Sequence, residues 1–307
     1  MIRLCFWGTR GSIVSPGTAM MRYGGNTSCV QIIGYDGLEP GGASAHVNPH
    51  IVIDGGTGIS MLQPVLMKGP WGRSKGELHI LLSHYHWDHI IGLPFFAPLF
   101  FKGNRIVFYG SDVENLKSSI ERLFTSVYSP IKGTKNLSAT IEYQKVESEG
   151  MKISGFDVRT CRTNHPAETT AYRLEYGGNS VVYATDHEAG NPDRDESLVG
   201  FAAGSDLLII DAQYTKDQKN VCSGYGHSSN IEAVELALAA GVAQVVLFHH
   251  NPGHDDRMLD MMRREAEERV KDSSLKVMMA RDGMLVELGR NAKVDKISGY
   301  NVSCGEC

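Results

Sequence analysis

Three histidines and one aspartate lie within six residues, directly behind an apolar run of the chain. The apolar run covers residues 78–82, and the sequence His-Tyr-His-Trp-Asp-His follows at residues 84–89. In extended backbone beyond a strand, side chains two positions apart point the same way, so His84 and His86 can converge on one cation. Asp88 and His89 follow where the chain changes direction, and they can bind a second ion. The segment therefore predicts a metal site at the end of a buried strand.

Two hydrolytic metal ions need more donors than this segment holds, and four further strand-like runs each end at such a donor. These donors are His165, Asp186, Asp211 and His249. Layered α/β folds collect their site residues just past the carboxyl ends of strands. A solitary polar residue in that position is commonly a cap or a turn former. Four of them in series, behind residues 84–89, indicate one shared site.

The order of these motifs resembles that of the metallo-β-lactamase-fold hydrolases. The family carries an early Asp, the His-x-His-x-Asp-His loop, a later His, a bridging Asp and a final His; here these are Asp54, residues 84–89, His165, Asp186 and His249. The resemblance covers residues 1 to about 290. It implies an α/β fold, a four-layered αββα metallo-β-lactamase sandwich with the site at one edge. It also implies two metal sites, with His84, His86 and His165 on one ion, Asp88, His89 and His249 on the other, and Asp186 between them.

The sequence Gly-His-Ser-Ser at residues 226–229 narrows the resemblance to the ribonuclease Z and small-phosphodiesterase branch of that superfamily. In that branch the equivalent His donates a proton to the leaving oxygen, supported by an acidic residue after an earlier strand. His227 and Asp211 stand at these two positions. The branch often has Glu in place of Asp211, but either carboxylate can accept the second imidazole N–H. The alternative interpretation is that His227 only caps the helix that follows it.

Two further groups of residues bear on a substrate pocket. Glycine-rich turns at residues 8–12 and 25–28 resemble the same branch, and their backbone N–H groups are expected to line a substrate phosphate unless these are ordinary tight turns. Aromatic residues in and beyond the metal segment either wall the pocket or pack into the core, and these are Trp87, Phe95, Phe96, Phe100 and Phe101. Neither group decides the substrate by itself.

The composition is that of a globular protein, with 42% hydrophobic and 21% charged residues in 307. We expect one hydrolase domain at residues 1–290 and a tail at 291–307, in which Cys304 and Cys307 are either inert or a metal or redox pair. Amphipathic helices are expected at residues 111–127 and 231–240. The sequence contains no 20-residue apolar segment and no leader-like start, which predicts a cytoplasmic protein without membrane contact.

Charge and spacing bear on the substrate. The net charge is −5 and there is no Lys/Arg stripe, so no nucleic-acid polymer is expected as a partner. His165 and Asp186 are only 21 positions apart, which leaves no room for the long arm with which related enzymes grip tRNA. A small phosphodiester such as a cyclic nucleotide is the expected substrate. Whether the chain forms a homodimer stays open.

The leading hypothesis is a phosphodiesterase with two divalent metal ions, zinc first and manganese or iron as alternatives. In it Asp88 orients the attacking hydroxide as well as binding metal, and His227, backed by Asp211, is the general acid. The alternative is a thioester, lactone or β-lactam hydrolase on the same two ions, which would not need Gly-His-Ser-Ser. A di-iron redox protein is a third hypothesis, but oxygen-reducing members tend to have a carboxylate where this chain has His86. Whether His250 or His254 joins the site is undecided.

Overall fold

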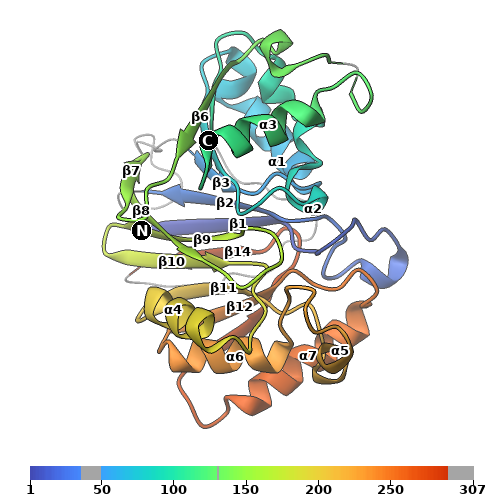
Figure 1. Ribbon diagram of the computed structural model, residues 1–307, viewed down its shortest axis with the longest axis vertical. Coiled ribbons are helices and arrows are strands. Elements are labelled where there is room, and N and C mark those ends of the chain that lie inside the picture. The colour runs from blue at the N-terminus through green and yellow to red at the C-terminus, as the bar shows by residue number, and fades with distance from the viewer. Residues whose placement is uncertain (36–49, 130, 290–307) are drawn as a thin grey trace.

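The computed structural model describes residues 1–35, 50–129 and 131–289, and these form two seven-stranded sheets (Figure 1). The first sheet has the order β14-β1-β2-β3-β4-β5-β6 and the second the order β13-β12-β11-β10-β9-β8-β7. The strands of the first sheet are β1 (Ile2–Gly8), β2 (Cys29–Gly34), β3 (His50–Ile53), β4 (Glu77–Leu81), β5 (Arg105–Gly110), β6 (Thr140–Lys145) and β14 (Leu285–Leu288). Those of the second are β7 (Met151–Ile153), β8 (Phe156–Arg162), β9 (Thr170–Tyr176), β10 (Asn179–Ala184), β11 (Leu207–Asp211), β12 (Gln244–Phe248) and β13 (Lys276–Met279).

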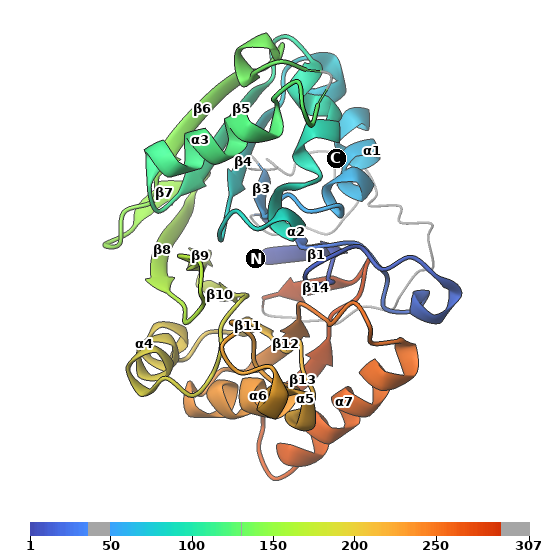
Figure 2. The same ribbon diagram turned by 45° about the vertical axis from the view of Figure 1, so that its right-hand side comes forward.

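Helices cover the outer face of each sheet, and the two inner faces pack on each other (Figure 2). On β10, Val181 and Tyr183 point into the core between the sheets, while Val182 and Ala184 pack against the outer helices. Burial of both faces explains why this run is continuously apolar rather than alternating. The predicted four-layered αββα sandwich is therefore confirmed. The α-helices are α1 (Ile59–Lys68), α2 (Trp87–Ile90), α3 (Val113–Leu123), α4 (Pro192–Ala202), α5 (Lys216–Val221), α6 (Asn230–Ala239) and α7 (Asp256–Arg269).

Both predicted amphipathic helices form, with local chemistry setting their ends. Helix α6 begins behind Ser229, whose hydroxyl and Glu232 make a reciprocal capping box, and it ends before Gly241 in the left-handed region. Helix α3 is shorter than predicted. It begins after Asp112, whose carboxylate accepts from the Asn115 N–H, and it stops at Leu123 instead of continuing to residue 127.

The site edge is built where parallel strands end. Strands β3, β4 and β5 run parallel in the first sheet, as do β10, β11 and β12 in the second. The chain bends sharply just past several of these ends, because Asp54, Asp186 and His249 have φ values of 61°, 53° and 61°. L-residues seldom adopt this left-handed conformation, and it is concentrated at functional sites.

Two expectations concern parts of the chain away from the site. The tail at residues 291–307, with Cys304 and Cys307, lies outside the described residues. Within the described ranges, none of the helices combines the length and apolar character needed to cross a bilayer.

Candidate metal centre

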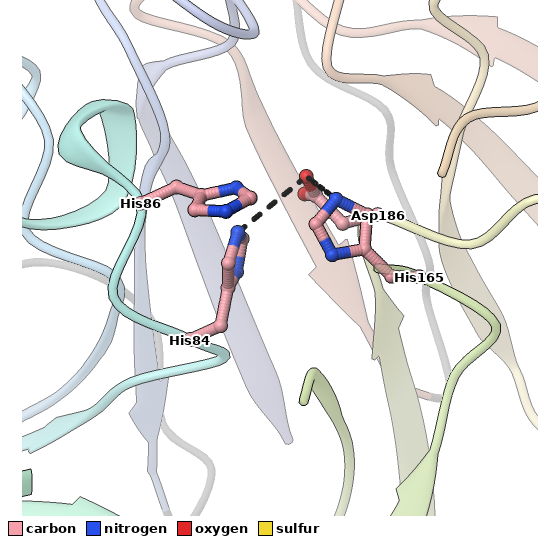
Figure 3. A group of neighbouring side chains, drawn as sticks. All are labelled: His84, His86, His165 and Asp186. Atoms are coloured by element: carbon pink, nitrogen blue, oxygen red, sulfur yellow. Dashed lines mark ion pairs between the residues drawn. The ribbon is translucent and has the colours of Figure 1, made fainter. Parts of the chain in front are cut away.

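Four side chains converge beside the N-terminus of α2 (Figure 3). They are His84, His86, His165 and Asp186, and each offers a donor atom within 4.8 Å of the others. His84 Nε2 and His165 Nε2 lie 3.7 Å and 3.6 Å from the same oxygen, Oδ1 of Asp186. His84 is buried, and its Nε2 has no hydrogen-bond partner. A buried ring nitrogen without a partner, aimed at a carboxylate and two other imidazoles, fits a metal ligand.

A second group of donors faces the other oxygen of Asp186. It contains Asp88, His89 and His249, which again lie within 4.8 Å of one another. The Nε2 atoms of His89 and His249 are each 3.4 Å from Asp186 Oδ2, and they lie 3.1 Å and 3.0 Å from Asp88 Oδ2. The two oxygens of Asp186 thus point to two separate donor groups. That arrangement can serve two cations with one shared carboxylate.

Asp54 and Ser83 hold the histidines from behind. His89 Nδ1 lies 2.7 Å from Asp54 Oδ2, which also accepts from the Tyr183 hydroxyl at 2.8 Å. The Ser83 hydroxyl donates to Asp54 and lies 3.1 Å from His84 Nδ1. A carboxylate on the far nitrogen of an imidazole leaves the near nitrogen free to bind metal and orients the ring. Asp54 was expected from the motif order, whereas Ser83 was not, although it directly precedes the histidine cluster.

Four buried carboxylates at this edge have imidazoles, not Lys or Arg, as their ion-pair partners within the described part of the chain. These carboxylates are Asp54, Asp88, Asp186 and Asp211. Burial alone would raise the pKa of Asp88 and Asp186, but the neighbouring imidazoles hold both pKa values far below their usual range. Buried negative charge of this density needs compensation by a cation.

The imidazoles of the two donor groups differ in the direction in which their pKa values are shifted. Burial lowers the pKa of His84, His86 and His165, which keeps these rings neutral, as metal ligands must be. Burial also acts to lower the pKa of His249, but Asp186, Asp211 and Asp88 outweigh it and raise that pKa to about 10. Divalent cations would supply the same positive charge that protonated imidazoles otherwise provide, so the donor set fits them.

His227 and Asp211 form a hydrogen-bonded pair beside the two donor groups. His227 Nδ1 lies 2.7 Å from Asp211 Oδ2, while Asp211 Oδ1 accepts from the Ser228 N–H at 3.1 Å. The residue that caps α6 is Ser229, so His227 is not the helix cap. Asp211 Oδ2 also lies 3.3 Å from His249 Nδ1, a contact that sequence analysis did not foresee. Gln213 adds a second neighbour to His249 Nδ1 at 3.1 Å.

Glu188 holds the loop that carries His227. Its carboxylate accepts from the backbone N–H groups of Gly224 and Gly226, both at 2.7 Å, and pairs with Lys219 at 2.5 Å. Gly226 has a φ of 92°, and a Cβ built there would lie only 2.0 Å from Cδ2 of His165. Glu188 lies two positions after Asp186, and that position is the only signal in the sequence that could have drawn attention to it.

A cavity of about 470 Å³ opens onto the centre. Two of the predicted catalytic residues, Asp88 and His227, line this cavity together with Trp87. The other predicted aromatics do not line it, and Phe96 is buried in the core. His250 and His254 stand apart from the donor groups, because their Nε2 atoms bond to Ala280 O and Gln218 Oε1, both at 2.8 Å.

Six N–H groups of the glycine-rich turns bond to acceptors within the protein and do not line a substrate phosphate as expected. Ser12 N–H donates to Asp88 Oδ2 at 2.8 Å, and most of the others bond within the turns or to the loop after β12. The N–H groups already used in this way are those of Thr9, Arg10, Gly11, Ser12, Asn26 and Thr27. The prediction is wrong for these groups, because tertiary contacts satisfy them.

A two-sheet sandwich with His and Asp donor groups at the strand ends defines a protein of the metallo-β-lactamase fold. The family model described as "Beta-lactamase superfamily domain" matches residues 50–250, and the chain belongs to this superfamily. It is 28% identical over 184 residues to the probable metallo-hydrolase YhfI of Bacillus subtilis, covering 58% of this chain and 68% of that protein. It is 24% identical over 249 residues to the ribonuclease Z of Picrophilus torridus, covering 64% and 75% of the two chains. The crystal structure of YhfI has the same fold, with a TM-score of 0.62, 21% identity and coverage of 92% of this chain and 98% of YhfI.

Proposed function

We propose that this hydrolase uses two bound divalent metal ions to cleave a small phosphodiester. Zinc is the expected metal, and manganese or iron are the alternatives. His84, His86 and His165 would hold one ion, Asp88, His89 and His249 the other, and Asp186 would be shared. The proposal rests on the contact between His227 and Asp211 at the wall of a cavity that both donor groups reach. A histidine supported in this way is what the departure of an unactivated alkoxide requires.

The bound ions would supply a nucleophilic hydroxide at neutral pH and offset the charge of the phosphoryl oxygens. Asp88, held by the Ser12 N–H, would orient the attacking oxygen. Because Asp211 engages Nδ1 of His227, the proton to be donated would sit on Nε2. As a P–O bond to the attacking oxygen formed, the bond to the leaving oxygen would break, and that oxygen would take the proton from Nε2 of His227.

The lining of the cavity favours a substrate with little negative charge. No Lys or Arg is among the residues that line it in the described part of the chain. A phosphodiester carries one negative charge, which the two cations can offset, whereas a polyanion usually meets additional basic side chains. Strands β9 and β10, which fill the interval from His165 to Asp186, are joined by Gly177 and Gly178 alone, and this favours a small substrate.

The alternative substrate is a thioester or lactone, since an uncharged ester also suits a cavity without basic side chains. The two possibilities differ in what they require of His227. A zinc-stabilised oxyanion and a good leaving group suffice for acyl hydrolysis, while an alkoxide leaving a phosphodiester needs a proton.

The test combines metal content with leaving-group dependence. The purified protein should contain about two metal ions per chain by elemental analysis. His227→Ala should slow hydrolysis of a cyclic nucleotide by roughly a hundred- to ten-thousand-fold, yet barely slow bis(p-nitrophenyl) phosphate, whose leaving group departs without a proton. His79→Ala, which changes a buried histidine outside the centre, is the matched control. Turnover of a lactone or thioester far above any phosphodiester would contradict the proposal, as would equal losses on both phosphodiesters with metals intact.

A further inference from the structure

The cavity beside the metal centre has an apolar wall that the hydrolytic chemistry does not use. Its lining includes Ile13, Val14, Trp87 and Ile91. Three of these side chains are solvent-exposed, with Ile13 at 61%, Val14 at 43% and Trp87 at 60% of their full accessible surface. Exposed apolar side chains that gather around a concave site mark a surface that a ligand covers.

The hydroxyl groups in the same lining are already engaged. The Thr27 hydroxyl accepts from the Thr57 N–H at 2.8 Å, and the Thr57 hydroxyl accepts from the Thr27 N–H at 2.9 Å and donates to Asn26. Ser12 Oγ accepts from Gln213 at 3.4 Å. These three hydroxyl groups are therefore held by neighbouring residues of the protein.

Trp87 stands next to the reacting centre. It is the first residue of α2 and lies between His86 and Asp88 in the chain. Its ring is packed edge-on against Tyr128, with 6.1 Å between ring centroids and an interplanar angle of 83°. The contact with Tyr128 gives the exposed indole a neighbour that restricts its orientation, and an oriented aromatic face is suited to stacking on a flat ring.

Ile13 and Val14 are held near the carboxylate of Asp88. The N–H of Ser12, the residue before Ile13, donates to Asp88 Oδ2, and Asp88 directly follows Trp87. Arg10 anchors this turn, because its fully buried guanidinium donates to Gly24 O at 2.8 Å and to His254 O at 2.6 Å. Both apolar parts of the wall are thus attached to the metal centre.

We propose that these residues form a subsite for a planar ring carried by the substrate, so that the substrate is a phosphodiester of the cyclic-nucleotide class whose base rests against Trp87 and the Ile13–Val14 turn. This inference rests on the proposed phosphodiesterase function. Stacking of a base on an aromatic side chain is sequence-tolerant, since every base has a π-face. The subsite therefore selects for the presence of a base more than for its identity.

A matched pair of substrates tests the subsite. Adenosine 3′,5′-cyclic phosphate and methyl riboside 3′,5′-cyclic phosphate share the reacting phosphodiester and differ in the base. The metal-loaded protein should favour the base-bearing substrate in kcat/KM by roughly tenfold or more. Trp87→Ala and Ile13→Ser should each reduce this preference, measured as the ratio of the two kcat/KM values, while Trp87→Phe should keep most of it. Phe95→Ala is the matched control, because Phe95 is 71% exposed and outside the cavity lining.

Tryptophan fluorescence gives a readout that does not depend on turnover. Of the three tryptophans, Trp7 and Trp71 are buried, so quenching by an added ligand reports Trp87. Adenosine 3′,5′-cyclic phosphate should quench the metal-free wild type, and Trp87→Phe should abolish that quenching. Equal kcat/KM for the two substrates, with active phosphodiester hydrolysis, would overturn the subsite alone. Failure to hydrolyse any phosphodiester, including bis(p-nitrophenyl) phosphate, would instead overturn the proposed function.

Discussion

Asp211 places one carboxylate oxygen between two imidazoles with different tasks. Oδ2 lies 2.7 Å from Nδ1 of His227 and 3.3 Å from Nδ1 of His249. In the proposed function the first ring carries the proton for the leaving group, and the second binds metal through its other nitrogen. In that function one oxygen would orient both the acid and a ligand, and the two tasks would be linked through it.

Asp211→Asn should consequently do more than weaken the general acid. An amide has one acceptor oxygen and no charge, so its NH2 group must face either the two imidazoles or the Gln213 and Ser228 N–H groups that Oδ1 now accepts. We therefore expect roughly a ten- to hundredfold loss of metal affinity in addition to slower cyclic-nucleotide hydrolysis. Competition with a metal-binding dye measures the affinity. His227→Ala should keep both ions at wild-type affinity, and an unchanged affinity in Asp211→Asn would show that the contact with His249 is not used.

The left-handed backbone at Asp186 has a measurable cost. In metal-free protein, Asp186→Gly should be about 1 kcal/mol more stable than Asp186→Ala, because both lose the carboxylate but only Ala keeps a Cβ in the left-handed conformation. Urea unfolding of the two variants measures the difference. At Asp193, in the first turn of α4, the same pair should reverse, since Gly disfavours a helix. Equal stabilities at Asp186 would mean that its backbone is not strained.

Site residues could be predicted where a short stretch of sequence around them carries the signal. The His and Asp donors could be located because each follows an apolar run, and His227 because of the short Gly-His-Ser-Ser motif. The hydrogen bond from Ser12 to Asp88 joins residues 76 positions apart, and only the folded chain brings them together. The same reason explains why the expected phosphate-facing N–H groups were wrong and why the second contact of Asp211 was missed.

At the scale of the elements, the loop between α5 and α6 is held at two of its residues, Gly224 and Gly226. Glu188 accepts from two of its N–H groups, and Gly226 approaches His165 so closely that a side chain does not fit. The loop thereby positions His227 relative to a proposed metal ligand.

Gly226→Ala should reduce metal content and activity together, because its Cβ would collide with the His165 ring. Gly224→Ala provides a close control: it has a similar φ of 88° against 92°, but a Cβ there meets nothing within 4 Å. We expect Gly224→Ala to lower the free energy of unfolding by roughly 1 kcal/mol with metal content unchanged. Elemental analysis and thermal melts separate the two effects, and equal metal loss in both variants would point to backbone strain alone.

For the two predicted helices, the type of element was predicted more accurately than its length. Helix α6 has its expected span within one residue, since Ser229 and Gly241 define both ends in the sequence itself. Helix α3 has an equally clear apolar stripe, yet it ends four residues early, where Phe124 is buried in the core. Periodicity does not mark this end, because Phe124 continues the apolar stripe while its backbone, at φ −98° and ψ 27°, leaves the helical region.

At the scale of the whole molecule, the proposed ions connect the two sheets. His84, His86, Asp88 and His89 follow a strand of the first sheet, whereas His165, Asp186 and His249 follow strands of the second. Each donor group takes members from both sheets. Bound cations would therefore act across the sandwich as well as in catalysis.

Removal of metal with a chelator should lower the melting temperature by several degrees. A ligand that binds only the folded state at a thousandfold excess over its Kd stabilises that state by about 4 kcal/mol. Zinc should restore the melting temperature of the wild type, and it should have much less effect on Asp186→Ala, in which the shared carboxylate is absent. Scanning calorimetry provides the measurement, and identical melts with and without chelator would contradict a role for cations in joining the sheets.

The pairing of β1 with β14 also has a consequence for biosynthesis. Ile2 lies opposite Leu288, so the first strand of the sheet obtains this neighbour only after 286 further residues have been made. At ribosomal rates of about 5–20 residues per second, the wait is roughly 15–60 s. During that time one edge of β1, an apolar strand, is available to other nascent chains, and the open edge is a site for intermolecular pairing. The yield of folded protein should therefore depend on chaperones that cover this edge during translation.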